Sequence, residues 1–235
     1  MEVALQRDLA HHLDVLGEAL KPPFQVVQAE LSNEWIFPIS HCPSEVQSDA
    51  EPPIRIGANP ELIEIDVVLG LYKPNEQQIT IFSRGIKQVA ELLGAPPVDL
   101  AFVVRLHEWA HAVLHTGLTD DERLRVTADE SLWPECLSRS TAWFVGLDTL
   151  VHERLAQLLT YHGLRSLRAE ATHPEAQATL DRIARNFDSL TRRTPVRYRI
   201  DHLLGAPKGR IRAGIRLLKD NTLVGASAWE TVMTW

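Results

Sequence analysis

The segment from Pro97 to Gly117, PVDLAFVVRLHEWAHAVLHTG, constrains the fold more than any other part of the chain. Apolar residues cover it on nearly every side, and a helix of this kind is buried in a folded protein. Asp99 can help to cap its first turn, and Gly117 can end it. The sequence therefore predicts a buried helix around which the rest of the chain must pack.

Two histidines on this helix, His107 and His111, are four positions apart, and Glu108 follows the first of them. Residues four apart lie about 40° apart around a helix and about 6 Å apart along it, so both imidazoles share a face. Imidazole nitrogens at this spacing can bind one Zn²⁺. Glu108 is turned about 100° away, where it can accept a proton from a water at the metal. The alternative is that the two histidines only hydrogen-bond to their neighbours.

A catalytic zinc site needs a third protein ligand and leaves its fourth position to water. His115 is close in sequence, but on one helix it lies about 12 Å along the axis from His107, and one ion cannot bind both. We therefore expect His115 at the surface or behind the ligands. The longer pattern H-E-x-x-H-x-x-G-x-x-H is absent, because Leu114 stands where its Gly would be and Gly117 where its last His would be.

Glu153 is the better third ligand, and it lies in a second helical stretch predicted across residues 143–163. The side chains on its face of that helix are mostly small, so this face can approach another helix closely. Gln157, one turn on, could accept a hydrogen bond from the free N–H of a metal-bound histidine. Asp148 lies on another face, and His152 is turned about 100° from Glu153, so we expect neither to contribute.

Other elements follow from apolar periodicity and from turn residues. Residues 63–71 alternate as a strand, residues 73–76 form a turn, and a return strand covers residues 79–82. A helix at residues 84–93 ends at Gly94 and leads to the histidine-bearing helix. Further expectations are a helix at 3–20, strands at 24–31, 35–39 and 54–56, a loop at 41–53, a flap or helical connection at 118–140, and helices at 174–190, 195–204 and 211–219.

The sequence HEWAH, with Glu153-Arg154-Leu155-Ala156-Gln157 downstream, resembles the gluzincin zinc metallopeptidases, whose third ligand is a Glu on a later helix. The order of hairpin, connecting helix and two motif helices is similar to that of compact bacterial ImmA/IrrE-type peptidase domains. The resemblance covers about residues 60–165. It implies His107, His111 and Glu153 as zinc ligands and Glu108 as the catalytic base.

The expected fold is α+β: a mostly helical, minimal zincin-like metallopeptidase domain with a small antiparallel sheet and a helical C-terminal extension. The domain would occupy residues 1–165, with its core at 60–165, and the extension, residues 166–235, would pack on it. A chain of 235 residues can bury such a core.

Composition and charge set limits on location and partners. Cys42 and Cys136 are too few for a disulfide framework. No apolar run approaches the ~18 residues of a membrane span, and the N-terminus lacks a secretory apolar region. We therefore expect a soluble, cytoplasmic protein without a membrane partner. The net charge is −7, yet residues 181–220 carry eleven Lys or Arg and four Asp, a local charge of +7. This segment could bind an acidic partner or nucleic acid, but docking on the acidic remainder or a solvated face is the expected role, because no nucleic-acid signature accompanies it.

The function expected from these residues is zinc-dependent hydrolysis of peptide bonds in a protein or peptide substrate, with Glu108 as general base. Tyr198 and His202, one turn apart, could stabilise an oxyanion, or could be a structural pair. The alternative is a regulatory interaction protein that keeps zinc for structure and binds through its basic C-terminal part. A metal-free helical scaffold is a third reading. Substrate identity and oligomeric state do not follow from the sequence.

Overall fold

The computed structural model describes residues 43–49, 54–56, 65–118, 120–201, 203–205 and 208–220. This part of the chain is mostly helical with a small sheet, an α+β arrangement. The predicted helix at residues 3–20 and strands at 24–31 and 35–39 lie outside the described residues. The strands are β1 (Ser44–Ser48), β2 (Ile54–Ile56), β3 (Ile65–Val67), β4 (Gly70–Lys73) and β5 (Gln78–Phe82). The α-helices are α3 (Ser83–Leu93), α4 (Pro97–Thr116), α5 (Asp120–Ala128), α6 (Trp133–Gly146), α7 (Thr149–Glu170), α8 (Pro174–Arg193) and α9 (Lys208–Asp220), with 3-10 turns η3 (Glu130–Leu132) and η4 (Val196–Tyr198).

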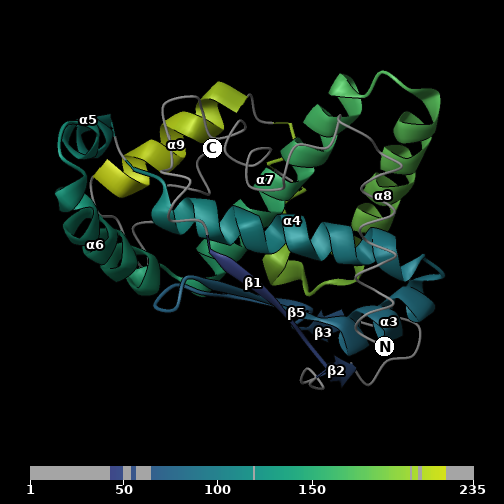
Figure 1. The fold of residues 1–235 in the computed structure, drawn as a ribbon. Coiled ribbons are helices and arrows are strands. Elements are labelled where there is room, and N and C mark those ends of the chain that lie inside the picture. The colour runs from purple at the N-terminus through teal and green to yellow at the C-terminus, as the bar shows by residue number, and fades with distance from the viewer. Residues whose placement is uncertain are drawn as a thin grey trace.

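Helix α4 lies at the centre of the molecule, which confirms the buried helix predicted for this segment (Figure 1). The sheet runs along one side of α4, and α7 packs against it on another. Helices α3 and α8 lie near its N-terminal end, and α5, α6 and α9 lie near its C-terminal end. Because α4 has neighbours all round, its apolar residues are buried on every face, as Leu100, Leu106 and Leu114 illustrate with no exposed surface.

The three-stranded sheet has the strand order β1-β5-β4. β4 and β5 form the predicted hairpin, but β1 pairs with β5 in parallel, so the predicted antiparallel sheet is wrong and the sheet is mixed. The loop predicted at residues 41–53 is wrong too, since it contains β1. The sequence of β1, SEVQS, has no apolar alternation, and only its pairing with β5 makes it a strand. The strand predicted at 63–71 is divided: β3 pairs with β2, and β4 begins after Val68 and Leu69.

The helical stretch predicted across residues 143–163 is also divided, into α6 and α7. The side chain of Asp148 accepts a hydrogen bond from the backbone N–H of Leu150 at 2.8 Å and caps the start of α7. Gly146 ends α6, so it does not share a helix with Glu153. The predicted helices at residues 84–93, 174–190 and 211–219 are confirmed as α3, α8 and α9.

Within the described residues of the segment 195–204, the predicted helix is reduced to the 3-10 turn η4. The carbonyl of Arg197 accepts a hydrogen bond from Arg154 Nε at 2.7 Å, and that of Thr194 accepts one from Arg199 Nε at 3.4 Å. These carbonyls therefore accept hydrogen bonds from side chains, not from the backbone N–H groups of a longer helix.

Asp99, expected as a cap, joins α4 to α8. The cap position of α4 belongs to Pro96, and the Asp99 carboxylate is completely buried. Arg182 donates to it from Nε at 2.6 Å and from Nη2 at 3.2 Å, and Asn186 donates from Nδ2 at 3.0 Å. A buried carboxylate needs such partners, so this cluster fixes how α8 crosses the start of α4.

Lys219 joins α9 to the opposite end of α4. Its ammonium donates to the carbonyls of His115, at 3.3 Å, and Gly117, and to the Ser140 hydroxyl at 3.3 Å. A cation is favoured at the C-terminal end of a helix because the last carbonyls point towards it. Arg182 and Lys219 both belong to the basic segment 181–220, so part of its charge serves contacts within the molecule. Binding of an outside partner by this segment stays a prediction.

The buried Lys219 predicts a pH dependence of stability. Burial lowers its pKa to about 7, although the charges of Glu122 and Asp220 act in the opposite direction. In the unfolded chain a lysine has a pKa of about 10.4, so from about pH 7 upwards the unfolded chain binds more protons here than the folded one. The free energy of unfolding should therefore rise with pH, by up to about 1.4 kcal/mol per unit, and be flat below about pH 7.

Urea unfolding between about pH 6 and 9 measures this effect. Lys219→Met should lose the rise, whereas Lys73→Met, which removes an exposed lysine, should keep it. Parallel stability curves for Lys219→Met and the unaltered protein would show that Lys219 does not titrate in this range.

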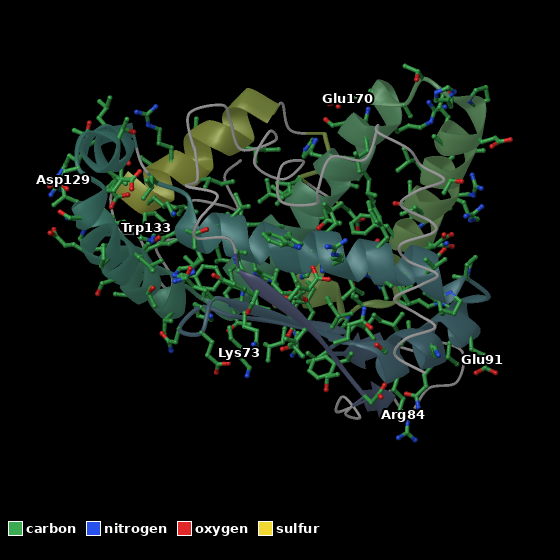
Figure 2. All side chains as sticks on the ribbon, in the orientation of Figure 1. Lys73, Arg84, Glu91, Asp129, Trp133 and Glu170 are labelled. Carbon is green, nitrogen blue, oxygen red and sulfur yellow. The ribbon has the colours of Figure 1, made fainter. Side chains whose placement is uncertain are left out.

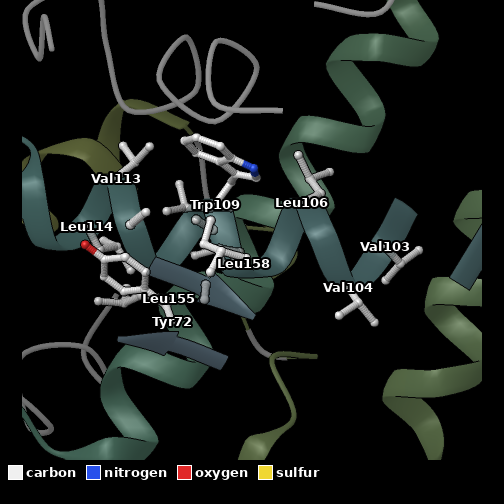
Figure 3. Close-up of a cluster of buried hydrophobic side chains, with 14 of the residues drawn as sticks. Tyr72, Val103, Val104, Leu106, Trp109, Val113, Leu114, Leu155 and Leu158 are labelled. Carbon is white, nitrogen blue, oxygen red and sulfur yellow. The ribbon is translucent and has the colours of Figure 1, made fainter. Parts of the chain in front are cut away.

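One hydrophobic cluster joins the sheet to the helices of both predicted parts of the chain. Figure 3 shows Tyr72 of β4 with residues of α4 and α7 in this cluster, among them Leu114, Leu155 and Leu158. The labelled charged side chains at the rim, such as Arg84, point outwards (Figure 2). The predicted boundary at residues 165 and 166 lies within α7, and the division into two domains stays a prediction. None of the described helices combines the length and the apolar character that crossing a membrane requires.

Candidate metal centre

The centre forms where α7 crosses α4. His107 and His111 lie one turn apart on α4, and their ring centroids are 4.7 Å apart with the rings nearly perpendicular. Glu153 reaches them from the second turn of α7, a helix that Asp148 starts at a defined position. The structure therefore brings together the two local candidates and the distant one named from the sequence.

The ligand atoms of this group are the Nε2 atoms of the two histidines and the carboxylate of Glu153. Nε2 of His107 lies 3.1 Å from Nε2 of His111 and 3.2 Å from Oε2 of Glu153. Nε2 of His111 lies 3.4 Å from Oε1 of Glu153. Ligands about 2.0–2.1 Å from a tetrahedral Zn²⁺ are separated by about 3.3–3.4 Å, so these spacings already suit one small ion. Among the described residues, this His-His-Glu group could hold a metal ion.

The charges of the group also favour a cation. Burial alone would raise the pKa of Glu153, but the charge of His111 and hydrogen bonds with His107 and His111 outweigh it and hold that pKa well below its usual range. Burial alone would lower the pKa of His111, but Glu153 and Glu108 outweigh it and raise that pKa. Both shifts come mainly from the attraction between Glu153 and His111, which keeps the Glu153 carboxylate ionised, as a metal ligand must be.

Glu108 lies beside the group without belonging to it. Its side chain is 5% exposed and lies against Gly70 of β4, and its carboxylate is held by the backbone N–H of Tyr72. Burial raises the pKa of Glu108, and the nearby Glu153 adds to this, while His107, His111 and the Tyr72 N–H act against it. A carboxylate with a raised pKa is suited to accept a proton near neutral pH.

A cavity of about 280 Å³ opens at the group. α4 and α7 supply its polar wall, and β4 with the preceding residues Val68 and Leu69 forms a second wall. The remaining wall comes from the C-terminal end of α8 and the segment after it, including Leu190 and Pro195. The lining of the cavity thus includes the metal group as well as residues of α8.

Of the other residues singled out from the sequence, Gln157 and Tyr198 line this cavity and His202 lies outside the described residues. The hydrogen bond expected from Gln157 to a histidine is not made: its Oε1 and the Nδ1 of His111 are both buried without a partner among the described residues. One is an acceptor, and the other becomes an N–H donor when Nε2 binds a metal. Tyr198 lies under the Arg197 guanidinium, 5.0 Å from the ring centre.

The sequence predicts no role for His152, but the structure places it in the cavity. Its Nδ1 lies 3.8 Å from Oε1 of Glu153, and its ring centroid lies 5.1 Å from that of His111. Burial lowers its pKa to about 4, with the His111 charge next, so the ring is neutral at pH 7. A helix presents a face more than 100° wide to its neighbours, so a residue next to a ligand can also point inwards. That width was the signal that could have identified His152.

His115 is neither a ligand nor a surface residue. It is completely buried, with Nδ1 2.6 Å from the Tyr72 hydroxyl and Nε2 2.8 Å from the Thr141 hydroxyl. Of the two positions expected for His115, the one at the surface is wrong. Gly70 and Tyr72, which surround Glu108 from β4, were not identified from the sequence, because no local pattern connects them to α4.

Comparisons of the chain with family models, curated proteins and solved structures gave no match.

Proposed function

We propose that this protein is a zinc-dependent peptidase. The observation that supports this most strongly is the convergence of His107, His111 and Glu153 beside a separate buried carboxylate, Glu108, on one cavity wall. Two imidazoles and one carboxylate are a ligand set that catalytic zinc sites use. The orientation of the His111 ring fits the same group, because its Nε2 faces Nε2 of His107 and the carboxylate of Glu153.

The number of ligands favours catalysis over a purely structural metal. Structural zinc sites almost always have four protein ligands, whereas catalytic sites have three and leave one position to water. The group formed by the described residues has three members. Glu108 is a further reason, because a structural site has no use for a buried base at its side. The reading as a regulatory protein with structural zinc is therefore the weaker one.

The sheet edge beside the cavity suits an extended polypeptide. In the described sheet β4 is an edge strand, and Leu71 and the neighbouring Val68 are 42% and 43% exposed. The carbonyl of Leu69 accepts a hydrogen bond from the N–H of Phe82 at 3.0 Å. The N–H of Tyr72 is taken by Glu108, but because bonding directions alternate along an antiparallel pair, the backbone groups of Gly70 and the carbonyl of Tyr72 also point away from β5. Such groups can pair with a peptide added as a strand.

In this mechanism, zinc bound at the group would supply a Lewis acid for the scissile carbonyl and would lower the pKa of water. Glu108 accepts a proton from the attacking water while the water oxygen bonds to the carbonyl carbon. Glu108 then gives that proton to the amide nitrogen as the carbon–nitrogen bond breaks. The products are one carboxylic acid and one amine, and transfer of the remaining proton of the water gives a carboxylate and an ammonium group. His107, His111 and Glu153 would hold the metal, and Tyr198 and His152 lie on the walls of the same cavity.

Purified protein should contain one zinc per chain and cleave unfolded protein substrates, detected as new peptide termini by mass spectrometry. 1,10-Phenanthroline should stop the cleavage, because the metal-free enzyme keeps Glu108 as the base but loses the Lewis acid. Zinc added in slight excess should restore the cleavage. Zinc-loaded protein that cleaves none of a broad set of unfolded proteins and peptides would contradict the proposal and favour a structural metal.

A further inference from the structure

Gly70 of β4 is in unusually close contact with Glu108. A Cβ atom added to Gly70 would lie 2.5 Å from Oε1, 2.6 Å from Cγ and 2.8 Å from Cδ of Glu108. Each of these distances is below the 3.0 Å that real Cβ atoms essentially never pass. Any residue other than glycine at position 70 therefore requires the Glu108 side chain to move.

The requirement for glycine is steric and does not come from the backbone. Among the described residues, Gly94 is the glycine with a positive φ, at 63°. Gly70 lies in a strand conformation that every residue can adopt. Its missing side chain leaves room for the carboxylate, and this is the close approach for which a glycine inside a strand is used.

β4 holds Glu108 from a fixed position, because a buried chain of hydrogen bonds anchors Tyr72. Thr141 donates its hydroxyl proton to the carbonyl of Leu137 at 2.8 Å, so its oxygen accepts from Nε2–H of His115. Burial, with the Lys219 charge second, lowers the pKa of His115 to about 3, so the ring is neutral and its Nδ1 is an acceptor. The Tyr72 hydroxyl therefore donates to Nδ1 at 2.6 Å.

The geometry points to Gly70 as a positioning residue for the Glu108 carboxylate: its bare backbone lets the side chain lie against β4, where the N–H of Tyr72 holds it towards the metal group. The inference rests on the proposed function, since it assigns Gly70 a part in placing the base. Gly70 itself touches no reacting atom. It acts by excluding other placements of Glu108, in the same way that packing around a site keeps a catalytic group in its productive geometry.

Gly70→Ala tests this in the zinc-loaded full chain. A displacement of about 1 Å at a catalytic group can lower the rate about 10²-fold, so kcat should fall by roughly that factor. KM and the zinc content should change little, because the added methyl group meets Glu108 and not a metal ligand. Gly209→Ala on α9 is the matched control, since an added Cβ there meets open space, and it should keep the original kcat. A Gly70→Ala enzyme with unchanged kcat would overturn the inference.

Thermal unfolding provides a second measurement that does not depend on catalysis. Gly70→Ala should lower the midpoint temperature when Glu108 is present, because the two side chains compete for one space. In a Glu108→Ala background the competing atoms are gone, and the same substitution should leave the midpoint unchanged or raise it. Equal lowering in both backgrounds would contradict a specific contact with Glu108. If the unaltered protein cleaves nothing, the peptidase proposal fails, while this cycle still decides whether Gly70 places Glu108.

Discussion

Glu108→Gln should abolish peptide-bond cleavage and leave the metal content unchanged. Gln has nearly the same shape as Glu, so it fits the space against Gly70 and can still accept the N–H of Tyr72. Its amide cannot take a proton from water, which is the step that we assign to Glu108. General-base catalysis contributes about 10²–10⁴-fold, so kcat should fall by at least that range. Steady-state kinetics with elemental analysis of the same sample measure both quantities.

Glu91→Gln makes the same chemical change on the exposed face of α3, away from the cavity, and should leave kcat and zinc content unchanged. If Glu108→Gln keeps its turnover, Glu108 is not the base. If it loses turnover together with its metal, the substitution has disturbed the ligands and the role of the base must be tested with another variant, such as Glu108→Asp.

Glu153→Ala should weaken zinc binding strongly, because it removes the only ligand of the described group that α7 supplies. Loss of a group that merely supports a ligand costs about 10–100-fold in metal affinity, so loss of the ligand should cost more than about 10²-fold. Competition with a chromophoric chelator measures this affinity. Cleavage at limiting zinc should fall in parallel, and excess zinc should restore only part of it.

Glu170→Ala, at the last residue of α7, is the control, because the same helix loses a carboxylate about 25 Å from Glu153. It should bind zinc as the unaltered protein does. Full zinc occupancy of Glu153→Ala at limiting metal would sink this ligand assignment and would direct attention to His152, the next side chain of α7 in the cavity.

The local part of the site could be predicted because it depends on one helix. The spacing of His107 and His111 places them on one face of any helix they belong to, and the apolar residues around them require that helix to be buried. The structure has both features in α4. The approach of Glu153 could be predicted as well, though only as the best of several carboxylates. The number of residues between His111 and Glu153, and the small residues on the Glu153 face of its helix, allow α7 to cross α4 closely. They do not require it to do so.

Errors arose where a side chain's role depends on a neighbour far away in the sequence. Asp99 is in the right place to cap α4, but Arg182 and Asn186, more than eighty residues on, bind its carboxylate. The strand β1 has no strand pattern of its own and exists through its parallel pairing with β5. His115 has the sequence context of a surface residue at a helix end, yet Tyr72 and Thr141 enclose it.

The sequence by itself therefore determined the central helix, the hairpin before it and the two imidazoles with their adjacent carboxylate, because helix and strand periodicities act over a few residues. Tertiary structure alone decided which further residues of β4 and α7 surround that helix: His152 beside Glu153 on one side, and Gly70 and Tyr72 on the other. Contacts between helices and strands depend on how whole faces pack. Many different sequences of one helix or strand can pack against the same neighbouring element. For that reason the place of Glu108 against Gly70 is visible only in the folded molecule.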